Sequence, residues 1–183
     1  MQRELVDRAK RGDEEAFDSL ARSVGDRCMA IASWVLRDVD LAEDAVQSAL
    51  VRAWRELRTL RDAYRFEAWL HRILINECYA EARRRTRWSA KIRLLPLDDR
   101  VETGGILSVD DSDQLERAFR RLSVEQRSVL VFHHYLGLPL PELAKRLGIP
   151  LGTAKSRLRL ATGALRASLE ADDRSNNSQE RLA

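Results

Sequence analysis

The feature that most constrains this chain is a predicted pair of helices joined by a tight turn within residues 140–169. In the first helix, apolar residues recur every three or four positions and so share one face; they are Leu140, Leu143, Ala144 and Leu147. Gly148 follows, a residue type that ends helices in the left-handed conformation, and Pro150 cannot continue a helix begun before it. This pattern predicts a helix-turn-helix, the motif that places its second helix in a DNA groove.

The second predicted helix has an apolar stripe on one side and a basic surface elsewhere. The stripe steps by three or four residues and comprises Ala154, Leu158, Ala161, Leu165 and Leu169. At about 3.6 residues per turn, small residues and cations lie opposite or beside it. Six of them are candidate DNA contacts: Gly152, Thr153, Lys155, Ser156, Arg157 and Arg159.

Positive charge is concentrated in this region. Residues 139–169 hold six basic side chains and one acidic side chain, whereas the whole chain has 32 basic and 29 acidic residues. Cations near phosphates supply affinity for DNA of any sequence, and a few side chains at the helix start can read base edges. A helix pair with a basic outer face is also an ordinary part of a helical bundle, but the turn chemistry and the local charge favour DNA binding.

The rest of the sequence indicates an all-α protein that is not an enzyme. Its 183 residues, 44% of them hydrophobic, suffice for one or two small domains, and no segment has the alternation of a strand. Cys28 and Cys78 lie far apart with no histidine at metal-ligand spacing, so we expect no metal, cofactor or small-molecule substrate. No apolar run of membrane-spanning length and no signal sequence is apparent, which predicts a cytoplasmic protein without membrane insertion.

Three main helices are predicted in the first half of the chain. Asp13 is expected to cap a long helix whose apolar stripe begins at Phe17, after a shorter helix around Val6. Asp40 and Glu43 have the spacing of a capping box for the second long helix. On its outer face lie four residues whose spacing alone indicates only a solvated surface: Asp44, Gln47, Ser48 and Val51.

The third helix, which starts its apolar stripe at Phe66, runs into a cluster of arginines. Residues 83–93 contain six basic side chains and no acidic one, a composition that favours a polyanionic partner such as nucleic acid. Trp88 within the cluster and Tyr64 before the helix offer stacking surfaces for single-stranded nucleic acid. Trp69 has the spacing of a core residue.

Helical periodicity stops after this cluster. Residues 89–113 contain Pro96, a glycine pair and an excess of acids, which predicts a flexible linker between two domains. The predicted organisation is therefore two small helical domains, 1–88 and 114–170, followed by a disordered polar tail at 171–183.

Two helices are expected to support the helix-turn-helix within the second domain. Asp113 with Glu116, and Ser123 with Gln126, have the spacing of capping boxes at the starts of these helices.

Several segments, in this order, resemble the extracytoplasmic-function sigma factors of bacterial RNA polymerase. RAKRGDEEAFDSLA is similar to the opening helix of that family, DLAEDAVQSALVRAW to its polymerase-binding helix, and FEAWLHRILINECYAEARRR to its promoter-melting helix. LSVEQRSVLVFHHYLGLPLPELAKRLGIPLGTAKSRL resembles the C-terminal domain of the family almost throughout. The resemblance implies a subunit that binds core RNA polymerase and promoter DNA, under control of an anti-sigma factor.

The resemblance also implies roles for individual residues. Asp44, Gln47, Ser48 and Val51 would face the polymerase, so their surface would be more than solvated. The promoter's minus-ten element would be captured as a melted single strand by residues of two segments: Leu60, Arg61, Tyr64, Asn76, Arg83, Arg84 and Arg85. The six candidates in the helix-turn-helix would recognise the minus-thirty-five element as duplex.

The chain departs from the family pattern at three places. Pro139 stands where a Ser or Thr often caps the first helix of the helix-turn-helix, fewer arginines follow Arg159, and Ser48 replaces a frequent acid. The main alternative function is a stand-alone helix-turn-helix regulator whose first domain senses a ligand or dimerises. An enzyme acting on nucleic acid is a weaker alternative, because no acidic cluster has usable spacing.

Overall fold

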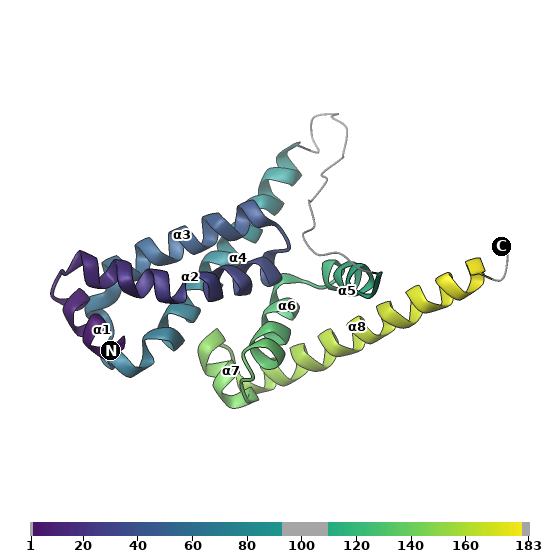
Figure 1. Ribbon diagram of the computed structural model, residues 1–183. Coiled ribbons are helices and arrows are strands. Elements are labelled where there is room, and N and C mark those ends of the chain that lie inside the picture. The colour runs from purple at the N-terminus through teal and green to yellow at the C-terminus, as the bar shows by residue number, and fades with distance from the viewer. Residues whose placement is uncertain (1, 93–109, 181–183) are drawn as a thin grey trace. The chain divides into compact units, whose positions relative to one another are not determined.

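The computed structural model describes residues 2–92 and 110–180, and within these ranges it contains helices and connecting turns but no strand (Figure 1). The chain divides into two compact units. None of the described helices is both long and apolar enough to cross a lipid bilayer.

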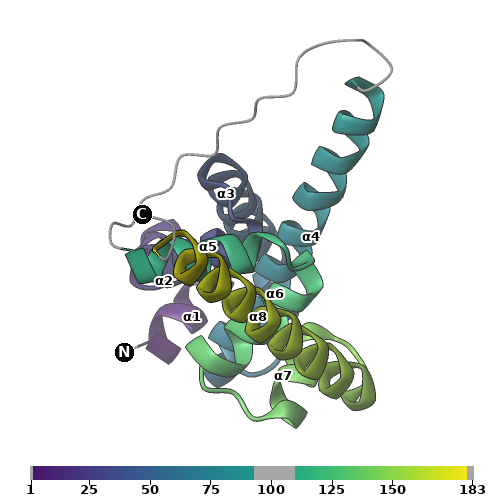
Figure 2. The same cartoon turned by 90° about the vertical axis from the view of Figure 1, so that its right-hand side faces the viewer.

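The first unit is a helical bundle whose core lies between three long helices. Its elements are α1 (Gln2–Lys10), α2 (Glu14–Leu36), α3 (Val39–Glu56), the 3₁₀ turns η1 (Leu57–Thr59) and η2 (Ala63–Arg65), and α4 (Phe66–Ile92). One face of α3 is a row of buried alanines: Ala42, Ala45, Ala49 and Ala53. Such small side chains let α3 pack closely against α2 and α4 (Figure 2).

The starts of α2 and α3 are fixed by aspartate caps. The predicted cap of α2 is confirmed, since Asp13 Oδ1 accepts the backbone N–H of Ala16 at 3.0 Å. The capping box predicted for α3 is wrong: its cap is Asp38, whose Oδ1 accepts the N–H of Leu41 at 3.0 Å. Arg37 ends α2 in the left-handed conformation, with φ of 58°, so the chain turns there and helix geometry resumes before Asp40.

In the second unit, two earlier helices come before the last two and pack against the last one. Its elements are α5 (Asp110–Arg120), α6 (Val124–Leu130), a π-helical segment η3 (Val131–Tyr135), α7 (Leu140–Leu147) and α8 (Leu151–Glu180). Both α5 and α6 pack against α8. The capping box of Ser123 and Gln126 is confirmed, whereas Asp113 lies inside α5, which begins at Asp110, and so is not its cap.

Helices α4 and α8 run further than the sequence predicted. Helix α4 continues through residue 92, beyond the expected linker boundary at 88, and α8 continues to Glu180, so most of the segment predicted to be a disordered tail is helical. Neither extension contains glycine or proline, the residues that break a helix most strongly. Most of the predicted flexible linker, residues 93–109, lies outside the described residues.

Candidate nucleic-acid interfaces

Helices α7 and α8 form the predicted helix-turn-helix. Gly148 has a φ of 66° and ends α7, as expected for the turn, and the N–H of Ala154 bonds to the carbonyl of Pro150 at 3.0 Å to start α8. Pro139 offers no capping side chain, but its carbonyl accepts the N–H groups of Glu142 and Leu143, each at 3.0 Å. The first turn of α7 therefore begins with backbone hydrogen bonds to Pro139.

The basic surface of α8 is exposed, as its sequence predicted. Ala154 and Ala161 are buried beneath the helix, and the six candidate DNA contacts lie outside this stripe. Four are exposed and two are half-buried: Gly152, Lys155, Ser156 and Arg159, then Thr153 and Arg157. Ser156 Oγ donates to the carbonyl of Thr153 at 3.0 Å, so its oxygen is left as an acceptor.

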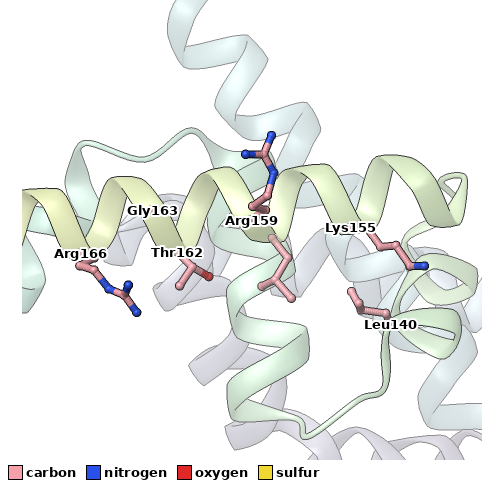
Figure 3. A pocket seen from close by; sticks show the side chains of 7 residues that line it. Leu140, Lys155, Arg159, Thr162, Gly163 and Arg166 are labelled. Carbon is pink, nitrogen blue, oxygen red and sulfur yellow. The ribbon is translucent and has the colours of Figure 1, made fainter.

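A hollow of about 500 Å³ lies beside this surface, between α8 and the start of α7 (Figure 3). Its apolar residues are Leu140 and Leu158, and three cations line it: Lys155, Arg159 and Arg166. Figure 3 shows Lys155 beside Leu140 at one end and Arg166 at the other. Arg166 was not among the predicted contacts, although its position seven residues after Arg159, about two turns further on, places both on the same face of the helix.

The predicted minus-ten residues before α4 lie in a loop of residues 57–65, which spans η1 and η2. Leu60 is buried, with 6% of its surface exposed, so its side chain anchors the loop. Arg61 and Tyr64 are exposed, Tyr64 to 78%. Asp62 shapes the turn, since its Oδ1 accepts the N–H of Tyr64 at 3.0 Å.

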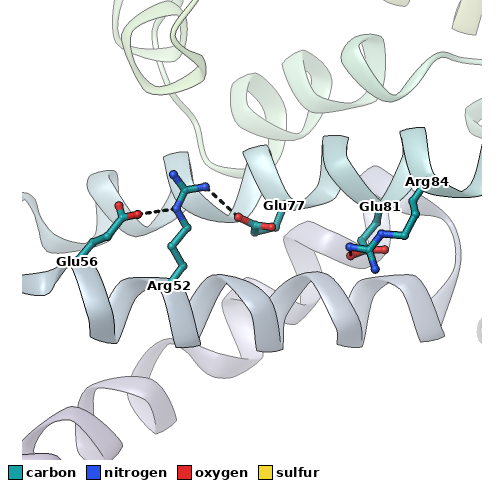
Figure 4. Close-up of polar contacts among 5 residues, drawn as sticks. All are labelled: Arg52, Glu56, Glu77, Glu81 and Arg84. Atoms are coloured by element: carbon teal, nitrogen blue, oxygen red, sulfur yellow. Dashed lines mark hydrogen bonds and ion pairs between the residues drawn. The ribbon is translucent and has the colours of Figure 1, made fainter.

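Helix α4 carries the remaining minus-ten candidates, and its arginines differ in their partners. Asn76 and Arg83 are exposed. Arg84 lies 2.7 Å from Oε1 of Glu81, a carboxylate that is 2% exposed (Figure 4). Arg85 lies 2.6 Å from Asp38. Two of the three adjacent arginines are therefore held by carboxylates of the same unit.

The predicted polymerase-facing residues share the solvent side of α3, opposite its alanine row. Asp44 and Gln47 are exposed, Val51 is 45% exposed, and Ser48 is half-buried. Beside this face, Arg52 donates hydrogen bonds to two carboxylates of the unit. One is Glu56 on the same helix, at 2.8 Å, and the other is Glu77 on α4, at 3.1 Å (Figure 4).

No cluster of three or more metal-ligating side chains occurs in residues 2–92 and 110–180. The buried thiols of Cys28 and Cys78 are both free.

Comparison with known proteins gives consistent matches. Residues 20–88 match the Sigma-70 region 2 family, and residues 112–165 match Sigma-70, region 4. The ECF RNA polymerase sigma factor SigM of Mycobacterium tuberculosis is 33% identical over 148 residues, which cover 80% of this chain and 73% of SigM. The RNA polymerase sigma-E factor of Streptomyces avermitilis is 31% identical, covering 93% of this chain and 94% of that protein.

Two solved structures are similar over most of the chain. The sigma factor RpoE in complex with the anti-sigma factor NepR from Bartonella quintana has a TM-score of 0.68 and 27% identity, covering 85% of this chain and 98% of RpoE. CnrH in complex with the cytosolic domain of CnrY has a TM-score of 0.62 and 28% identity, covering 93% and 98% of the two chains.

Proposed function

Because the chain belongs to the ECF family of RNA polymerase sigma factors, we propose that its two helical units recognise different parts of a promoter. A sigma factor of this family directs core RNA polymerase to specific promoters at transcription initiation. Such a role needs two kinds of DNA contact, to duplex and to melted single strand, and the two exposed basic surfaces have those chemistries.

Helix α8 reads the minus-thirty-five element in the major groove. The observation that carries this assignment is the exposed basic start of α8, where Lys155, Ser156 and Arg159 project from a helix whose opposite side is buried. Cationic side chains in the first turns of a recognition helix reach base edges and phosphates. Arg166, further along the helix, adds a phosphate contact, which compensates for the scarcity of arginines directly after Arg159.

The 57–65 loop and α4 hold the melted minus-ten strand. Tyr64 has the exposure needed to stack on an unpaired base, with Arg61 beside it in the loop and Asn76 as a hydrogen-bonding residue on α4. Arg83 supplies a phosphate contact. Arg84 and Arg85 contribute to the same positive field, but Arg84 also pairs with Glu81 of the same helix, and Arg85 joins α4 to Asp38 at the start of α3.

The outer face of α3 binds core polymerase through Asp44, Gln47, Ser48 and Val51. An exposed valine beside polar and acidic side chains is suited to a protein partner, because interface cores bury apolar groups within polar rims. The domains that perform these tasks are residues 1–88 and 114–170, and neither needs a cofactor or performs catalysis. The protein acts in the cytoplasm.

An anti-sigma factor controls the protein. RpoE and CnrH, the two similar structures, were each solved in complex with another protein, and NepR in the first is an anti-sigma factor. The surfaces proposed to bind polymerase and DNA are the ones such an inhibitor needs to cover.

Transcription reconstituted with sigma-free core enzyme tests the proposal. The purified chain should produce transcripts from specific start sites on double-stranded promoter DNA. Tight operator binding without such transcripts would instead indicate a stand-alone regulator, and nuclease or transferase activity that is lost on replacing one acid would indicate an enzyme.

Two substitutions test whether the second unit binds duplex DNA and the first binds the melted strand. Lys155→Ala should weaken binding to minus-thirty-five duplex by about 1 to 3 kcal/mol. Asn76→Ala should leave duplex binding unchanged and impair open-complex formation, measured by permanganate reactivity of unpaired thymines. Equal effects of both substitutions on duplex affinity would contradict the assignment.

A further inference from the structure

Helix α1 lies before the segment that matches Sigma-70 region 2, which begins at residue 20. It is anchored by Val6 and Ala9, which are 0% and 3% exposed. It packs against α2 and also contacts η1 and η2, the two turns of the 57–65 loop. The helix thus contacts both the bundle and the loop.

Lys10, the last residue of α1, holds the middle of the loop. Its Nζ donates a hydrogen bond to the backbone carbonyl of Leu60 at 2.7 Å, in a partly buried setting. This carbonyl follows η1, where the backbone leaves helical geometry with ψ of 110°. A charged donor on a partly buried carbonyl is worth more than a neutral one, so this contact favours one path of the loop.

Arg3, in the first turn of α1, holds the exposed end of the loop. Its guanidinium lies over the ring of Tyr64, 5.1 Å from the centroid, and Nη1 donates to the Tyr64 hydroxyl at 3.1 Å. Tyr64 is nevertheless 78% exposed, so the contact orients the ring while leaving most of its surface open to stack on a base. Gln2 adds a bond of 3.3 Å to Glu67, in the first turn of α4.

We infer that α1 positions the 57–65 loop for capture of the melted strand, and that Lys10 and Arg3 are positioning residues for this step. Lys10 fixes the backbone path at Leu60, and Arg3 fixes the ring of Tyr64. The inference rests on the proposed role of this loop. A loop already held in its binding shape loses less conformational entropy when the strand binds, which increases affinity.

The test uses holoenzyme assembled from the full chain and sigma-free core polymerase. The probe is a non-template-strand oligonucleotide spanning the minus-ten element of a promoter mapped with the wild-type holoenzyme, with 2-aminopurine placed at one position at a time. Lys10→Met removes the donor and keeps the length of the side chain, and should weaken oligonucleotide binding by about tenfold. Lys10→Arg keeps a charged donor and should restore the affinity.

Arg11→Met is the matched control, because it removes one positive charge from the next residue, which is exposed in the turn after α1. It should bind the oligonucleotide like the wild type. Arg3→Met should reduce the fluorescence change at the base that stacks on Tyr64 more than at other positions. None of these variants should alter binding to a duplex fragment that carries only the minus-thirty-five element.

Two outcomes would overturn the inference. In the first, Lys10→Met and Arg11→Met bind the oligonucleotide with equal affinity. In the second, Lys10→Met loses as much affinity for the duplex fragment as for the oligonucleotide. The second outcome would indicate general misfolding. Tyr64→Ala separates this inference from the proposed function. If it leaves oligonucleotide binding unchanged, the loop itself has been assigned wrongly; if it weakens binding while Lys10→Met does not, only the role of α1 is wrong.

Discussion

Arg85 Nη1 lies 2.6 Å from Oδ2 of Asp38, the same carboxylate whose other oxygen caps α3. The contact joins the arginine-rich end of α4 to the start of the helix proposed to bind polymerase. Asp38 is largely buried and Arg85 is 40% exposed in its side chain. One carboxylate therefore serves both helix capping and packing of α3 on α4.

Replacing Asp38 should separate these two contributions. Asp38→Ala removes the cap and the ion pair and should lower the free energy of unfolding by about 1 to 2 kcal/mol. Asp38→Asn keeps an acceptor for the N–H of Leu41 and should cost clearly less. Urea denaturation followed by circular dichroism measures both, and equal losses would mean that the ion pair, not the cap, dominates.

Arg83 and Arg84 should respond in opposite ways to the same substitution. Arg84→Gln leaves the buried carboxylate of Glu81 without its ion-pair partner and should destabilise the protein by about 1 to 2 kcal/mol, whereas Arg83→Gln should leave stability unchanged. For DNA binding we expect the reverse: Arg83→Gln should weaken binding without lowering the free energy of unfolding, whereas the main effect of Arg84→Gln should be on stability. Adding Glu81→Gln to Arg84→Gln should recover part of the stability, and its failure to do so would argue against this pairing.

Salt dependence should distinguish phosphate contacts from base contacts on α8. If Arg166 contacts only a phosphate, Arg166→Ala should weaken binding to all promoter sequences similarly and reduce the slope of log K against log salt by about 1. Arg159→Ala should instead relax the preference at one base position. Fluorescence anisotropy with wild-type and base-substituted duplexes at several salt concentrations measures both, and a base-specific effect of Arg166→Ala would contradict its assignment.

Substitutions on the proposed polymerase-binding face of α3 should weaken polymerase binding. Asp44→Arg and Val51→Asp both alter the exposed face and should weaken association with core enzyme by about 1 to 3 kcal/mol, because they place a wrong charge at an interface. Glu43→Arg offers a control, since Glu43 is exposed on the same helix but is not among the proposed contacts. The affinity is measured by titrating labelled protein with core polymerase, and equal losses for Glu43→Arg would indicate a nonspecific charge effect.

The two buried thiols should make stability depend on pH in the alkaline range. Burial raises the pKa of Cys28 to about 11 and the pKa of Cys78 to about 12, from an ordinary value of 9.0. Below about pH 9 both states keep these protons, so the contribution is fully present; above it the unfolded chain releases protons that the folded chain retains. The free energy of unfolding should therefore fall as pH rises from about 9 towards 11.

Urea denaturation across this pH range measures the effect. The double variant Cys28→Ala with Cys78→Ala is the control, and its unfolding free energy should fall less steeply with pH. An unchanged slope would show that other groups account for the alkaline destabilisation. Iodoacetamide reacts with the thiolate, and burial keeps both thiols protonated in the folded protein at about pH 8. The reagent should therefore label them only as fast as the protein unfolds.

Local patterns in the sequence were sufficient for much of the fold. Several correct predictions depend only on residues within a few positions of one another. They are the turn at Gly148, the cap at Asp13, the capping box at Ser123 and the helical spacing of buried positions along α8. Where the prediction failed, competing local signals were present. Asp38 and Asp40 are both acceptable caps, and only the left-handed turn at Arg37 decides between them.

Helix ends are a second place where local patterns leave the outcome open. The stretch after residue 170 is polar, so its composition suggested disorder, but it contains neither glycine nor proline, the residues that break a helix most strongly. The structure continues α8 to Glu180.

The sequence by itself determined an all-α chain with a helix-turn-helix, the residues that face outward from its helices, and its membership of a sigma factor family. Only the tertiary structure decided which of those outward residues are already engaged with distant parts of the chain: Arg85 with Asp38, Lys10 with Leu60, and Arg3 with Tyr64. Periodicity is set by the geometry of a single helix, whereas the pairing of residues such as Lys10 and Leu60, which lie 50 positions apart, depends on how helices pack.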